Sequence, residues 1–135
     1  MRLLLDTHAF LWFFTDDPQL SATAKALIAD PTNEILVSPA SYWEVAIKVS
    51  IGKYPLTVPF EEFWTAGING SGFVILPIAL PHATVLSSLP MHHKDPFDRM
   101  IISQAIAEQI PVVTTLAMRF AFKMIGKLLV MCGQE

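Results

Sequence analysis

The sequence predicts an α/β fold in which a central parallel sheet lies between two layers of helices. Two observations predict it. Short apolar segments alternate along the chain with longer segments of helical character, which is the pattern of right-handed βαβ units. The apolar segments carry no alternation of polar and apolar residues, which is typical of strands that are covered on both faces.

The predicted strands are short and end at turn or capping residues. The first is the leucine run 3–5, which leads directly into Asp6. The others are expected at residues 35–38, 73–76 and 111–114, with 128–130 as a fifth strand in a less regular tail.

Helix start and stop residues mark the segments between the strands. Ser21 is a typical N-cap, Pro39 suits a first helical turn, and glycines after Ile68 end a helix. The predicted helices cover residues 9–14, 22–29, 39–52, 60–68, 81–89 and a segment that Asp95 opens.

Length and composition limit the class of protein. With 135 residues, of which 53% are hydrophobic, we expect a single domain spanning 1–135. No apolar run approaches the roughly 18 residues that cross a bilayer, and Asp6 interrupts the first run too early for a signal peptide. The lone Cys132 fits a reducing compartment, so we expect a cytoplasmic protein with no membrane partner. The net charge of −3 argues against broad electrostatic capture of nucleic acid.

Three acidic residues are predicted to meet at one edge of the sheet. Asp6 follows the first strand, Glu44 lies in the helix after the second, and Asp98 lies in the first turn of the helix before the fourth. Ligands of open α/β sheets bind at the carboxyl ends of the strands. Clustered carboxylates without histidine or cysteine ligands favour Mg²⁺ or Mn²⁺, so a metal-dependent nuclease site is expected there.

Each acid also has a simple structural interpretation. Asp6 alone is typical of a turn or cap, and Glu44 alone of a helix surface. Asp95 is most simply an N-cap. Asp98 lies in the first helical turn, where its negative charge interacts favourably with the helix dipole. The joint placement at one sheet edge is what favours the functional interpretation.

Three motifs together resemble the PIN-domain family, in particular toxin ribonucleases of the VapC type, over roughly residues 1–115. They are Leu4-Leu5-Asp6-Thr7-His8 with Leu11-Trp12, the segment Ser38 to Lys48 ending in Gly52-Lys53, and His93 to Ile102. The resemblance implies a PIN-like three-layer α/β/α sandwich with strand order 3-2-1-4-5. It also implies a Mg²⁺-dependent endoribonuclease that cleaves RNA, is neutralised by a cognate VapB-like antitoxin and forms a homodimer.

The resemblance assigns catalytic roles to four acids of this sequence. Asp6 matches the first metal-binding acid, Glu44 the second, and Asp98 the acid that opens the helix before the fourth strand. Asp95 is characteristic of the Asp-Pro-Phe-Asp-Arg subgroup. It either assists the other acids at the active site or only caps the helix.

Further residues of the motifs have supporting roles. Thr7 is expected to support Asp6, and Arg99 either pairs with an acid or contacts phosphate, with the paired structural role favoured. His8 and His93 match subgroup positions and are expected to be hydrogen-bonding structural residues, not metal ligands.

The sequence departs from the family pattern after the fourth strand. The family places an acid where Leu116 stands, and residues 116–135 match poorly. Thr114 and Thr115 are candidates to orient water in place of that acid. The departure leaves open an alternative function, a PIN-fold module that binds a protein partner and has weakened or lost catalysis.

Overall fold

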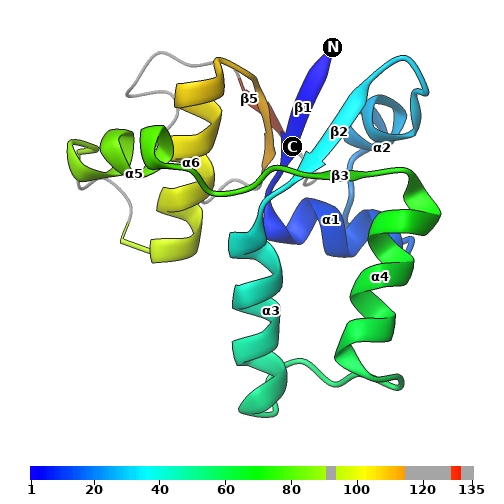
Figure 1. The fold of residues 1–135 in the computed structure, drawn as a ribbon. Coiled ribbons are helices and arrows are strands. Elements are labelled where there is room, and N and C mark those ends of the chain that lie inside the picture. Colours follow the sequence, from blue (N-terminus) through cyan, green and yellow to red (C-terminus); the bar gives the residue numbers. More distant parts are fainter. Residues whose placement is uncertain (91–93, 115–128, 132–135) are drawn as a thin grey trace.

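The sheet at the centre of the molecule is parallel throughout. The computed structural model describes residues 1–90, 94–114 and 129–131 (Figure 1). Within these residues the sheet has five strands in the order β3-β2-β1-β4-β5, the order that the family resemblance implies. The strands are β1 (Arg2–Leu5), β2 (Glu34–Val37), β3 (Val74–Ile75), β4 (Val112–Thr114) and β5 (Leu129–Met131).

Helices connect the strands, and several begin where the sequence predicts. They are α1 (Thr7–Phe14), α2 (Ala22–Ala29), α3 (Pro39–Ser50), α4 (Phe60–Ser71), α5 (Leu80–Ser87) and α6 (Pro96–Glu108). The first begins at Thr7, two residues before the predicted start, because Asp6 is its N-cap. Ser21 caps α2 and Asp95 caps α6 through their side chains. In the described part of the chain, no helix combines the length and the apolar character that crossing a membrane requires.

Helix α4 is longer than the sequence predicted, ending at Ser71 instead of Ile68. Asn69 and Gly70 continue the last turn, and the helix stops only at Gly72, which has a φ of 71°. A left-handed residue at this position ends the helical hydrogen-bond pattern, and glycine adopts it without a steric penalty.

The two faces of the sheet are covered by different helices. Leu3 and Leu5 belong to a buried cluster that includes residues of α1, α2 and α4. Leu4, between them, belongs to a second cluster with Ile101 and Ile102 of α6. Because successive side chains of a strand point to opposite faces, the alternation confirms the predicted three layers. Figure 1 shows α1, α2 and α4 away from α5 and α6.

Phe10 is the aromatic centre of the first cluster and is fully buried. Its ring centroid lies 4.5 Å from that of Trp64 and 6.2 Å from that of Phe73. Helix α4 approaches this ring at Gly67, where an added Cβ atom would stand 2.6 Å from Phe10 Cζ. The position of α4 therefore depends on a residue without a side chain.

Several sequence expectations lie outside the described residues. They concern His93, Thr115 and Leu116, together with residues 116–128 and 132–135 of the tail.

We expect Gly67→Ala to destabilise the fold by about 1–3 kcal/mol, because the new methyl group has no space beside the buried Phe10 ring. Gly70→Ala, in the same helix, is the matched control, since nothing lies within 4 Å of its added Cβ. It is expected to stabilise the protein by about 0.5–1 kcal/mol through helix propensity. Urea unfolding measures both, and equal effects of the two substitutions would contradict the packing argument.

Candidate functional site

Asp6 ends the central strand β1 and begins α1, where its carboxylate is only 1% exposed. One oxygen, Oδ1, accepts a hydrogen bond of 2.7 Å from the backbone N–H of Ala9. The other, Oδ2, accepts a 2.9 Å bond from the hydroxyl of Thr114 at the end of β4. Asp6 is therefore an N-cap and is also held at the carboxyl edge of the sheet, so its structural and functional interpretations do not exclude each other.

Glu44 lies in α3 with only 6% of its surface exposed. The Thr7 hydroxyl donates a 2.8 Å hydrogen bond to Glu44 Oε1 and lies 3.0 Å from Ser41 Oγ. Since a hydroxyl has one proton, Ser41 donates to Thr7 when Thr7 donates to Glu44. Thr7 was expected to support Asp6, but its hydroxyl holds Glu44. Thr7 links the two acids, because it follows Asp6 directly in the chain and its hydroxyl bonds to Glu44.

Lys48 is a residue of the site that sequence reasoning missed. Its Nζ lies 2.8 Å from Glu44 Oε2, and its side chain is 39% exposed. The signal in the sequence was the i,i+4 spacing of opposite charges on one helix. The ammonium group places a positive charge directly against one of the two buried carboxylates.

The amino-terminal end of α6 carries the remaining predicted residues. Asp95 Oδ1 accepts a 2.9 Å bond from the backbone N–H of Asp98, which confirms its capping role. Arg99 donates to the backbone carbonyls of Pro90 and Leu89 at 3.0 and 3.1 Å, so it holds the segment that follows α5. Asp98 is partly buried in the first helical turn.

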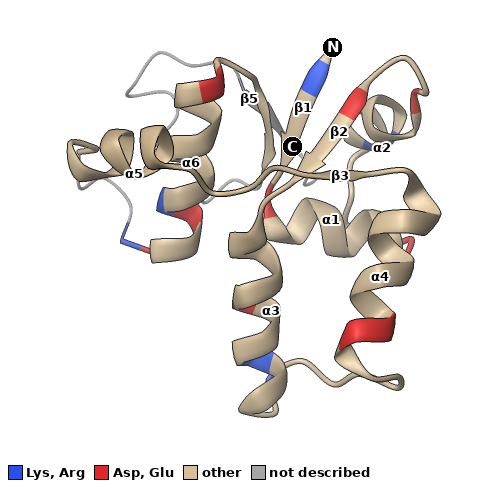
Figure 2. Ribbon diagram, in the orientation of Figure 1, with Lys and Arg blue, Asp and Glu red and all other residues tan. Residues whose placement is uncertain are grey.

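The structure unites part of the predicted ligand set. Figure 2 shows acidic positions at the junction of β1 and α1, on α3 and at the amino-terminal end of α6. Over residues 1–90, 94–114 and 129–131, however, no three carboxylate, imidazole or thiol side chains are grouped closely enough to hold a metal ion. Asp6, Glu44 and Asp98 therefore do not form a complete ligand set in this conformation.

The side chains at the sheet edge still fit a hard divalent ion. Asp6 and Glu44 are both buried and supply only carboxylate oxygens. Mg²⁺ is commonly held by one or two carboxylates, with waters and substrate phosphates completing its coordination. The carboxylate oxygens of the two acids joined through Thr7 are thus suitable ligands for Mg²⁺.

The family model described as the PIN domain matches residues 3–121. The chain belongs to the PIN domain family. This confirms the resemblance that the three sequence motifs carry. The matched region runs past Leu116, so the departure at that position lies inside the domain.

Individual relatives agree with this assignment. This PIN domain is 34% identical over 70 residues to Ribonuclease VapC16 of Mycobacterium tuberculosis, a match that covers 49% of this chain and 48% of that protein. The chain thus spans about half the length of that relative.

Two solved structures share the fold over almost the whole chain. One is VapBC2 from Rickettsia felis bound to a DNA fragment from their promoter. Its TM-score is 0.69 at 20% identity, covering 98% of this chain and 99% of that chain. The other is VapBC-1 from nontypeable Haemophilus influenzae, with a TM-score of 0.65 at 17% identity, covering 97% and 98%. At these identities the likeness shows the fold alone.

We expect Thr7→Val to destabilise this PIN domain by about 1–3 kcal/mol, because it leaves the buried Glu44 and Ser41 groups without a shared partner while keeping the side-chain shape. Thr84→Val is the matched control, since Thr84 is exposed and its hydroxyl donates to the Leu80 carbonyl in its own helix. Its effect is expected to stay within about 0.5 kcal/mol. Thermal unfolding compares the two, and a harmless Thr7→Val would show that the buried bond has no stabilising role.

Proposed function

We propose that this PIN domain is a Mg²⁺- or Mn²⁺-dependent endoribonuclease of the VapC toxin type. The observation that carries the proposal is the pair of buried carboxylates, Asp6 and Glu44, joined through Thr7 at the carboxyl edge of a parallel sheet. Apolar surroundings make such carboxylates costly unless they are hydrogen-bonded or bound to a cation. The similarity to Ribonuclease VapC16 supports ribonuclease activity.

In this proposal Asp6 and Glu44 would hold the ion, and Asp98, in the first turn of α6, is the candidate for a third ligand. A bound divalent ion would supply Lewis acidity and would lower the pKa of a water, which is the chemistry that hydrolysis of an RNA phosphodiester needs. Thr114 keeps the Asp6 carboxylate at the sheet edge, and Thr7 does the same for Glu44. These hydrogen bonds fix the oxygens before substrate arrives, which is the preorganisation that catalysis by electrostatics requires.

The proposal includes a protein partner, a cognate VapB-like antitoxin, and a homodimer, in the cytoplasm. The fold shared with the VapBC2 and VapBC-1 structures supports an antitoxin partner. The chain itself offers apolar surface near α3 and α5, where Trp43 is 61% and Leu80 is 79% exposed. An apolar cavity of about 290 Å³ lies beside Trp43 and Phe97. Contiguous exposed apolar surface marks places that partners cover.

A second candidate function is a PIN-fold binding module with weakened or lost catalysis. It is favoured by Leu116, which replaces an expected acid, and by the incomplete grouping of Asp6, Glu44 and Asp98 over the described residues.

The substitution Asp6→Asn separates these functions. Asparagine caps a helix as well as aspartate does, so α1 should keep its N-cap while the site loses one charged ligand. With purified, antitoxin-free protein and Mg²⁺ or Mn²⁺, cleavage of structured RNA should fall by at least about 100-fold. Mg²⁺ should raise the melting temperature of the wild type, since a ligand at 100 times its Kd adds about 2.7 kcal/mol. That rise should be lost in Asp6→Asn.

The control for this experiment is Asp30→Asn, which removes a carboxylate from an exposed turn remote in sequence from the site. It should leave both cleavage and metal stabilisation unchanged. No cleavage by the wild type, or equal cleavage by Asp6→Asn, would contradict the nuclease assignment. A stable complex with the small protein encoded beside it, without any cleavage by the free protein, would instead support the binding module.

Lys48 provides a further test, because its ammonium group and a metal ion compete for Glu44. We expect Lys48→Met to lower stability in EDTA by about 1–3 kcal/mol, since a buried carboxylate loses its charged partner. The stabilisation by Mg²⁺ should then exceed that of the wild type. Lys53→Met, which changes an exposed lysine of the following segment, is the control. Thermal unfolding with and without Mg²⁺ measures both, and identical metal-induced shifts in all three proteins would refute the competition.

A further inference from the structure

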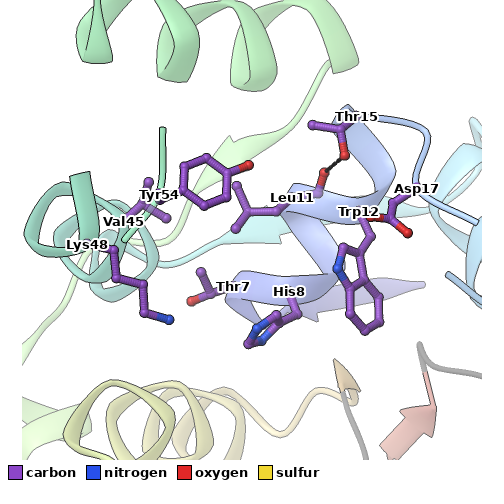
Figure 3. Close-up of a pocket in the computed structure, with 9 residues that line it drawn as sticks. All are labelled: Thr7, His8, Leu11, Trp12, Thr15, Asp17, Val45, Lys48 and Tyr54. Atoms are coloured by element: carbon purple, nitrogen blue, oxygen red, sulfur yellow. Dashed lines mark hydrogen bonds between the residues drawn. The ribbon is translucent and has the colours of Figure 1, made fainter. Parts of the chain in front are cut away.

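A small cavity opens beside Thr7 and Lys48, the two residues that bond to Glu44. It has a volume of about 150 Å³ and lies between α1, α3 and the segment that follows α3 (Figure 3). Thr7 and Lys48 form part of its wall, and both bond to the carboxylate of Glu44. Thr7 and Lys48 therefore connect the cavity wall to Glu44, although Asp6 and Glu44 do not themselves line the cavity.

The cavity combines aromatic faces with an apolar interior. His8 and Trp12 lie on α1 with ring centroids 5.6 Å apart and an angle of 57° between the ring planes. Leu11 and Val45 contribute buried apolar surface. His8 is exposed and Trp12 is partly buried, so both rings are accessible from solvent.

Two polar side chains supply a donor and an acceptor in the same cavity. Tyr54 carries a phenol, and Asp17 a carboxylate that also accepts a 2.8 Å bond from the backbone N–H of Gln19. Burial raises the pKa of Tyr54, and the negative charge of Asp17 raises it further. The phenol therefore stays protonated at neutral pH and remains a donor.

We propose that this cavity binds one nucleobase of the RNA whose phosphate lies at Asp6 and Glu44. The inference rests on the proposed ribonuclease function and adds a base-binding subsite to it. Aromatic side chains that stack a base, with donors and acceptors at its edge, are how proteins recognise unpaired RNA bases. The volume of about 150 Å³ is half of the roughly 300 Å³ at which pockets for drug-sized ligands begin, so it suits a single small ring system.

The position of Lys48 supports a nucleotide as the occupant. The base and the phosphate of a nucleotide are separated by one sugar, so the two groups need adjacent subsites. Lys48 lies at the boundary between the cavity and Glu44, where its positive charge favours an anionic phosphate. Local recognition of this kind also fits the net charge of −3, which provides no general attraction for RNA.

The test is binding of mononucleotides to the full chain in EDTA. AMP, GMP, CMP and UMP are titrated by NMR at millimolar concentrations, with ribose 5-phosphate as the ligand that lacks a base. At least one nucleotide should bind about tenfold more tightly than ribose 5-phosphate. Trp12→Ala and His8→Ala should each reduce this advantage, and the exposed position of His8 makes its variant safe for folding.

Trp43→Ala is the matched control, because Trp43 is an exposed tryptophan of α3 that contacts Phe97 and does not line the cavity. It should keep the full advantage of the nucleotide. The proposal is overturned if every nucleotide binds no better than ribose 5-phosphate, or if Trp43→Ala is as damaging as Trp12→Ala. It is also overturned if Trp12→Ala abolishes binding of the antitoxin but leaves nucleotide binding unchanged, which would assign the cavity to the protein partner.

This experiment is independent of the nuclease test. Mononucleotides contain no internucleotide bond, and EDTA removes the metal, so binding is measured without cleavage. A preferred nucleotide without RNA cleavage would refute the proposed function and keep the base site. Cleavage that depends on Asp6, without any preferred nucleotide, would keep the proposed function and refute the base site.

Discussion

The hydrogen bond from Thr7 to Glu44 is the interaction on which the arrangement of the site depends. It joins two residues 37 positions apart, the first in α1 and the second in α3. A buried carboxylate without a donor is costly, so α3 must approach α1 with Glu44 facing Thr7. Because Thr7 follows Asp6, this one contact also sets the relation between the two candidate metal ligands.

The sheet gives this contact a rigid base. Strand β1 pairs with β2 and β4, and its three leucines, Leu3, Leu4 and Leu5, are fully buried in two different clusters. Close packing on both faces leaves the end of β1 little freedom. Asp6 is therefore placed by the core, and its hydrogen bonds to Ala9 and Thr114 only orient the carboxylate. The same aspartate stabilises α1 and belongs to the site, so stability and function are coupled at this residue.

Charge around the site is balanced locally. Glu44 contacts the ammonium group of Lys48, and the cavity beside it contains a further carboxylate at Asp17. In the proposed function, an arriving metal ion and Lys48 exert the same kind of attraction on Glu44 and cannot both occupy one position. In the proposed base site, the aromatic cavity would recognise a single base of the RNA. A chain with few basic residues depends on such local contacts, because it lacks a broadly positive surface that attracts RNA.

Local sequence patterns were sufficient for the order of strands and helices and for the caps at Ser21 and Asp95, because strand burial, capping and βαβ connection act over short distances. Tertiary structure alone decided that Thr7 serves Glu44 and that Thr114 reaches Asp6 across 108 positions. It also decided that Gly67 makes room for Phe10 and that a cavity opens beside Lys48. These features depend on how closely distant segments pack and on the side-chain rotamers that packing selects, and no pattern of neighbouring residues encodes either of them.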